Sequence, residues 1–174
     1  MENVKSLMTI QSDISKWDGK SASDITEIYE RHYADDSFIS IIVNSISDLH
    51  LQKGGTWLLK HYLENDHKIS PSETSDLFNQ LTSLEHWESK LHILQSLPFL
   101  TIPKSDIKKI EHFLRKSLME TNKFIRAWSY NGFYELAMQY PEYKEETKQF
   151  FEMAMKDEAP SVISRIRNII KKGF

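Results

Sequence analysis

Helix-length patterns in this chain restart at a fixed interval of 37 residues. Asp48, Glu85 and Asn122 each follow an apolar segment and stand just before the next one, and each is 37 positions from its neighbour. The segments "WESKL", "FIRAW" and "SVISR" begin at residues 87, 124 and 161, again 37 apart. Such a period is typical of stacked helix pairs, because an isolated pair cannot bury its apolar face.

Helical periodicity supports this interpretation along most of the chain. Between residues 123 and 140 one apolar stripe recurs at three- and four-residue steps: Phe124, Ile125, Trp128, Gly132, Phe133, Leu136, Ala137 and Tyr140. Pro98 and Pro141 are expected to end the helices before them, since proline lacks the amide hydrogen. Five glycines and five prolines are few for 174 residues, which favours long helices over many-stranded sheets. The sequence therefore predicts an all-α fold of about nine or ten helices.

The helices are expected to pair in chain order. The expected pairs are 21–35 with 36–50, 55–66 with 70–85, 85–100 with 103–120, and 123–140 with 142–156, followed by a last helix near 160–170. Ser70 or Ser72 is expected to cap one of them.

The segment from Phe124 to Lys172 resembles the HEAT repeats of the armadillo-like superfamily. The matching features are Ile125-Arg126 opening one helix, Pro141 after it, and the acidic "MKDEA" turn before "SVISR". The resemblance implies a right-handed α-α superhelix of antiparallel pairs, a single domain spanning 1–174. Within it, 1–22 would be an N-terminal cap, 23–84 divergent repeats, and 85–172 clearer repeats with a terminal helix. It also implies a ladder of acidic and basic residues between repeats, whose spacing Glu120 and Arg126 match; at the next repeat, position 163 is Ile instead of a basic residue.

Composition excludes several classes of protein. There is no cysteine, so disulfides and thiolate metal sites are absent. The first residues lack the pattern of a secretory signal, and no segment has the roughly 20 apolar residues of a membrane span. We therefore expect a cytoplasmic protein with no membrane partner.

Charge is unevenly distributed, with −7 over residues 1–87 and +4 over 88–174. On the helix expected to open at Pro103, Lys104, Lys108 and Arg115 fall on one side, away from the apolar face. This stripe is either an ordinary solvent-exposed face or a surface for phosphates or carboxylates.

Tyr130 and Tyr134 lie one turn apart and off the centre of the apolar stripe. They either fill the seam between neighbouring repeats or serve as anchors for a partner. The isoleucine stripe of the last helix is expected to be covered by Arg165, Arg167, Lys171 and Lys172, or else to form a weak dimer seam; the chain is otherwise monomeric.

No catalytic, metal or cofactor motif is evident. Glu88 with His92, and His61 with Asn65, have four-residue spacing, but no third ligand stands at a matching position. Gly54-Gly55 lacks the spacing of a phosphate-binding loop and is expected to loosen the entry to the following helix.

The sequence thus predicts a non-catalytic protein-interaction module or scaffold that binds a protein partner through Lys104, Lys108, Arg115, Tyr130 and Tyr134. A regulatory subunit that stabilises an enzyme is a variant of this hypothesis. The alternative is a nucleic-acid-binding HEAT protein similar to the alkylpurine DNA glycosylases. Arg126, Trp128 and the basic stripe favour this alternative, but Gly132 stands where that resemblance implies a catalytic acid, and a pI near 6.2 disfavours duplex binding.

Overall fold

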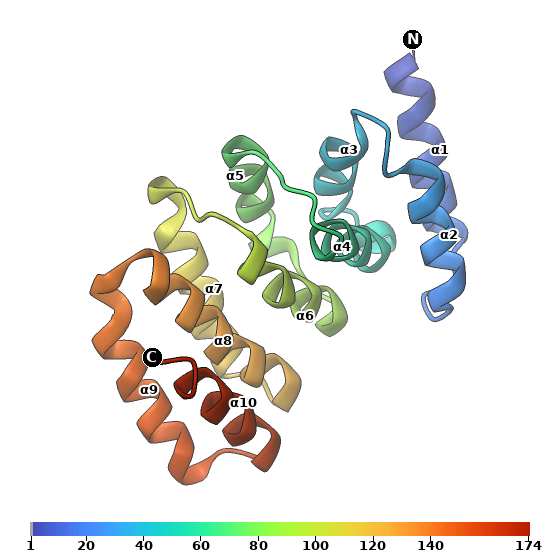
Figure 1. The fold of residues 1–174 in the computed structure, drawn as a ribbon. Coiled ribbons are helices and arrows are strands. Elements are labelled where there is room, and N and C mark those ends of the chain that lie inside the picture. Colours follow the sequence, from blue (N-terminus) through green and yellow to red (C-terminus); the bar gives the residue numbers. More distant parts are fainter. Residues whose placement is uncertain (1) are drawn as a thin grey trace. The chain divides into compact units, whose positions relative to one another are not determined.

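The computed structural model describes residues 2–174, with side chains from residue 9 onward. Ten helices and four short 3-10 turns account for this range, and no strand occurs within it, so the all-α prediction is confirmed (Figure 1). The helices are α1 (Glu2–Lys16), α2 (Ala22–His32), α3 (Phe38–Ser45), α4 (Leu49–Glu64), α5 (Pro71–Asn79), α6 (Trp87–Ser96), α7 (Ile107–Leu118), α8 (Lys123–Gln139), α9 (Lys144–Asp157) and α10 (Pro160–Ile170).

The helix starts reproduce the 37-residue spacing to within one residue. Helices α4, α6, α8 and α10 begin at residues 49, 87, 123 and 160, and α5, α7 and α9 begin at 71, 107 and 144. Side-chain caps define several of these starts: Asp48 accepts from the His50 amide, and Asn122 from the Phe124 amide. Ser70 caps α5 in a reciprocal capping box with Glu73.

The chain forms two compact units, residues 1–100 and 101–174. In the first unit, α4 packs on α3 and most extensively on α6, while α3 also packs on α5. The main helix contacts of this unit therefore differ from the expected pairs of α2 with α3 and of α4 with α5, since α2 packs on α1 and α4, and α5 packs on α3.

In the second unit, α8 is the central helix and packs on α7, α9 and α10 (Figure 1). Ile125, Phe133 and Leu136 of α8 are fully buried, as the apolar stripe predicts. Phe124 is the exception, because it stands at the open start of the helix and is 52% exposed. The 3-10 turns Leu97–Phe99 and Pro141–Tyr143 follow α6 and α8, so both prolines do end their helices as expected.

The isoleucine stripe of α10 is largely buried where this helix packs on α8 and α9. Val162, Ile166 and Ile169 are buried in a cluster with Ala127, Tyr130, Phe151 and Ala154, and Phe174 packs against that cluster. The Phe174 ring lies 5.3 Å from that of Tyr134 and 5.6 Å from that of Phe151. Val162, Ile166 and Ile169 are therefore buried within the unit, while Arg167, Lys171 and Lys172, expected to cover the stripe, are exposed.

Gly54 and Gly55 lie inside α4 instead of loosening its entry. A Cβ atom on Gly54 would stand 2.6 Å from Cγ2 of Ile14, so the missing side chain is what lets α1 approach α4. Gly55 has only ordinary contacts at 3.6 Å and beyond. Of the two glycines, Gly54 is therefore the one that helix packing requires.

Candidate functional site

The three basic residues expected to form a stripe do not lie on one helix. Lys104 belongs to a 3-10 turn, Lys104–Asp106, because α7 begins only at Ile107. Lys104 is therefore not on the same helix face as Lys108 and Arg115, as a continuous helix from Pro103 would require, and its side chain is exposed. Lys108 and Arg115 are on α7, and both contact Glu111.

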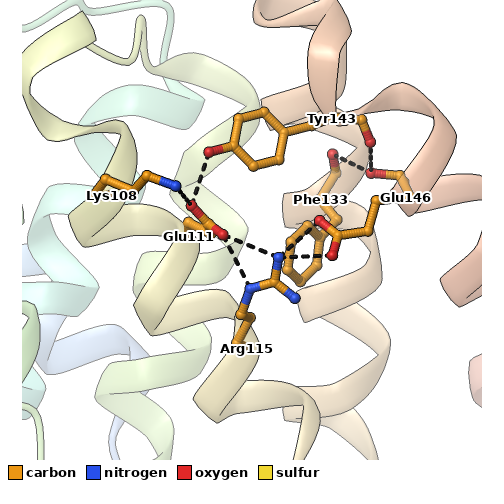
Figure 2. A network of polar contacts seen from close by, with 7 residues as sticks. Lys108, Glu111, Arg115, Phe133, Tyr143 and Glu146 are labelled. Carbon is orange, nitrogen blue, oxygen red and sulfur yellow. Dashed lines mark hydrogen bonds and ion pairs between the residues drawn. The ribbon is translucent and has the colours of Figure 1, made fainter.

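Glu111 is the centre of a polar network that joins α7, α9 and the turn between α8 and α9 (Figure 2). Its carboxylate accepts hydrogen bonds from Lys108 at 2.7 Å, from the Tyr143 hydroxyl at 2.8 Å and from Arg115 at 3.0 and 3.1 Å. Burial raises the pKa of Glu111, but the hydrogen bonds from Lys108, Tyr143 and Arg115 outweigh it and lower the pKa to about 2.

Arg115 is paired with two carboxylates within the unit. It also binds both oxygens of Glu146 on α9 at 2.7 and 2.8 Å, and its guanidinium lies 5.6 Å from the ring centre of Phe150. Two carboxylates thus balance Lys108 and Arg115, and the network connects helices of the unit. It leaves little uncompensated positive charge for a partner.

The two tyrosines take part in packing. Tyr130 is 8% exposed and lies edge-on to Phe151, with ring centres 6.2 Å apart. Burial raises the pKa of Tyr130 to about 12, and Glu158 acts in the same direction. Tyr134 is partly buried against Phe174. Both side chains fill the seam between helices, and Tyr130 offers almost no surface to a partner.

Arg126 of α8 forms an ion pair with a carboxylate in the turn before α10. The spacing in the sequence suggests Glu120 as its partner. Its guanidinium binds Glu158, 32 residues later, at 2.8 and 2.9 Å. Its remaining nitrogen donates to the backbone carbonyl oxygens of Glu120 and Thr121. Arg126 therefore contacts Glu120 through the Glu120 backbone.

A polar pocket lies between α8 and α10. It has a volume of about 190 Å³ and is lined by Asn131, Ser161, Ser164, Arg165, Asn168, Ile169 and Lys172. The α10 members recur every three or four residues, so they form one face along the whole helix, roughly 15 Å long. All of the polar lining residues carry hydrogen-bond donors.

Arg165 is the central residue of this pocket. Its guanidinium carbon lies 3.8 Å from the ring centre of Trp128 on α8, a stacked cation–π contact. Burial lowers the pKa of Arg165, and no carboxylate among the described residues pairs with it. A half-buried guanidinium with no anionic partner gains more from a bound anion than an exposed one, because part of its hydration has already been lost.

One acidic residue stands near the far end of the pocket. Glu135 is partly buried, and burial raises its pKa against the opposing effects of Lys172 and Asn131. Lys172 is therefore partly balanced by Glu135, whereas Arg165 is not balanced. The arrangement favours one anionic group at Arg165, with hydroxyl and amide donors beside it.

The 37-residue period is the signal that would have located this pocket in the sequence. Trp128 and Arg165, Asn131 and Asn168, and Glu135 and Lys172 are each 37 residues apart. Equivalent positions on neighbouring helices of a repeat lie side by side, and α8 packs on α10. Sequence reasoning looked for charge along one helix and so missed a site formed across two.

The histidine pairs serve as structural contacts. His92 is hydrogen-bonded to Thr56 at 3.0 Å, and Glu88 pairs with Lys53 at 3.0 Å. Asn65 donates to the backbone carbonyl of His61. Within the described residues, no three histidine or carboxylate side chains gather where they could hold a metal ion.

Comparison with protein-family models, with curated proteins and with solved structures finds no match to this chain. Across the helices that the structure describes, none combines the length and the apolar character needed to cross a membrane. Fold and site together define the chain as an all-α protein of recurring helices, with a donor-lined pocket in its second unit.

Proposed function

We propose that this protein is a non-catalytic interaction module, a HEAT-like α-solenoid whose second unit binds an anionic side chain of a protein partner in the α8/α10 pocket. The observation that carries the proposal is the half-buried guanidinium of Arg165, stacked on Trp128 and unpaired with any described carboxylate. An aspartate or glutamate of the partner would supply the missing charge through a two-pronged hydrogen bond.

The shape of the pocket supports a segment of polypeptide as the ligand. Its polar residues continue along α10 from Ser161 to Asn168 and on to Lys172, just past the end of the helix, so an extended segment of about four or five residues fits beside them. The serine hydroxyls and the Asn168 amide provide donors for the backbone carbonyls of that segment. The Lys108, Glu111 and Arg115 network would act as support for the unit.

Nucleic acid is the second candidate, because residues 101–174 carry a net charge of +4 and an arginine stacked on tryptophan also suits a phosphate. Against it, Lys108 and Arg115 are balanced by carboxylates, and Glu135 stands beside the pocket. Titration with a labelled DNA duplex at about 50 mM salt tests this candidate, since binding to phosphates weakens steeply as salt rises.

Affinity purification from the native cell tests the leading proposal. Wild-type protein is compared with Arg165→Ala and with the matched control Arg167→Ala, which removes the same charge from an exposed position on the same helix. The proposal requires one stoichiometric protein to be lost with Arg165→Ala and kept with Arg167→Ala, and the purified pair to bind directly. Equal recovery with both variants, or DNA binding that depends on Arg165, would overturn it.

A further inference from the structure

The neighbouring helices α4 and α6 each begin with a large apolar residue exposed to solvent. Leu49, the first residue of α4, is 43% exposed, and Trp87, the first residue of α6, is 46% exposed. The two helices pack on each other, and the His86 ring donates to the Leu49 carbonyl oxygen at 3.2 Å. The first unit thus presents two apolar side chains at one edge.

The backbone beneath these side chains is held rigidly by Gln52, which is fully buried. Its amide nitrogen donates to the carbonyl oxygens of Ile46 at 2.9 Å and Ser83 at 2.8 Å. Its oxygen accepts from the amides of Glu85 at 2.9 Å and His86 at 3.1 Å. One side chain therefore joins the start of α6 to α4, and a surface fixed in this way loses little conformational entropy on binding.

The charge around this edge is negative. Asp48 directly precedes Leu49, and Glu85 lies two residues before Trp87. Both acidic residues are exposed. Lys53 and Glu88 bridge the two helices and balance each other. Residues 1–100 together carry 8 basic and 15 acidic side chains, a net charge of −7. Acidic groups around apolar anchors are complementary to a segment that is both basic and apolar.

The equivalent position in the second unit has the opposite surroundings. Phe124, near the start of α8, is similarly exposed at 52%, but Lys123 lies 5.6 Å from its ring centre. The preceding cap is the neutral Asn122 instead of an acid. Trp87 and Phe124, 37 residues apart, are thus both exposed, while the negative surroundings belong to the first unit.

We infer that Leu49 and Trp87 form a docking surface for a basic amphipathic segment of a partner protein, with an apolar residue seated against Trp87 and flanking Lys or Arg side chains facing Asp48 and Glu85. This surface is separate from the α8/α10 pocket and does not depend on it. Trp87 is the main anchor, because a large aromatic ring gains most from completed burial.

The test uses a synthetic amphipathic helix of leucine and lysine, about four turns or roughly 14 residues long, and a counterpart with glutamate in place of lysine. Each is titrated into the full chain at about 50 mM salt, and binding is followed by amide and indole NMR shifts. We expect shifts confined to the starts of α4 and α6 with the lysine peptide only, and affinity at least about tenfold lower for Trp87→Ala.

Two further variants complete the experiment. Phe124→Ala is the matched control, since it removes an equally exposed ring and should leave affinity unchanged. Glu85→Lys should weaken binding of the lysine peptide and leave the NMR spectrum that of a folded protein. Three outcomes would overturn the inference. The two peptides bind equally, Phe124→Ala and Trp87→Ala lower the affinity equally, or the lysine peptide causes no NMR shift at α4 and α6.

Discussion

Arg126 on α8 and Glu158 in the turn before α10 form a two-pronged ion pair with N–O distances of 2.8 and 2.9 Å. Both side chains are largely buried, with exposed fractions of 21% and 14%. Removal of Arg126 leaves the Glu158 carboxylate and the carbonyls of Glu120 and Thr121 without this donor. We therefore expect Arg126→Ala to lower the free energy of unfolding by about 2–3 kcal/mol, measured by urea denaturation.

The control for this change is Arg167→Ala, at an exposed position where a change of about 0.5 kcal/mol or less is expected. The hydrogen bonds from Arg126 lower the pKa of Glu158. The contribution of the pair is therefore present above the ordinary glutamate pKa and is lost as pH falls through the lowered value. Equal destabilisation by the two arginine variants would contradict the assignment.

The Glu111 network predicts a second pH dependence at lower pH. Its pKa of about 2 is below the ordinary value of 4.5, so the unfolded chain binds more protons in this interval. Glu111→Gln should be less stable than wild type at pH 7, and the difference should shrink as pH falls from about 4.5 towards 2. Urea denaturation of both proteins across that interval tests this, and a constant difference would exclude the network as the cause.

His92 predicts a loss of stability as pH falls below neutrality. Burial lowers its pKa to about 3 from 6.5, so the folded protein keeps this ring neutral while the unfolded chain protonates it. Between about pH 6.5 and pH 3, this residue should remove about 1.4 kcal/mol of unfolding free energy per pH unit. His92→Gln should flatten the slope of unfolding free energy against pH, whereas His50→Gln, at an exposed position, should not. Parallel slopes for wild type and both variants would refute the prediction.

The paired glycines of α4 predict opposite effects of the same substitution. Gly54→Ala places a methyl group 2.6 Å from Ile14 Cγ2 and should destabilise the protein by about 1–3 kcal/mol. Gly55→Ala meets only ordinary contacts and should stabilise it by up to about 1 kcal/mol through helix propensity. Thermal and urea unfolding of the two variants checks the sign, and a stabilised Gly54→Ala would show that α1 does not approach α4 as closely as described.

The all-α class, the restarts of the helices and several caps were predictable from the sequence. These depend on local properties: the spacing of apolar residues, the missing amide of Pro141, and the side chains of Asp48, Ser70 and Asn122 just before helices. Such interactions join residues that are close in the sequence, so they can be predicted without the tertiary structure.

The contacts that form the candidate pocket were not predictable from local patterns alone. Trp128 and Arg165 contact each other only because α10 packs beside α8, and Glu146 balances Arg115 only because α7 and α9 both pack on α8. A stripe that looks basic along one helix is neutral once the carboxylates of other helices are placed against it.

The sequence by itself determined that the chain is helical and at what period its helices restart, because backbone hydrogen bonding and side-chain periodicity act within one segment. The tertiary structure decided which charges are balanced, which glycine admits a neighbouring helix and which aromatic rings are buried. Those outcomes depend on distances between segments that are far apart in the chain, and packing sets them.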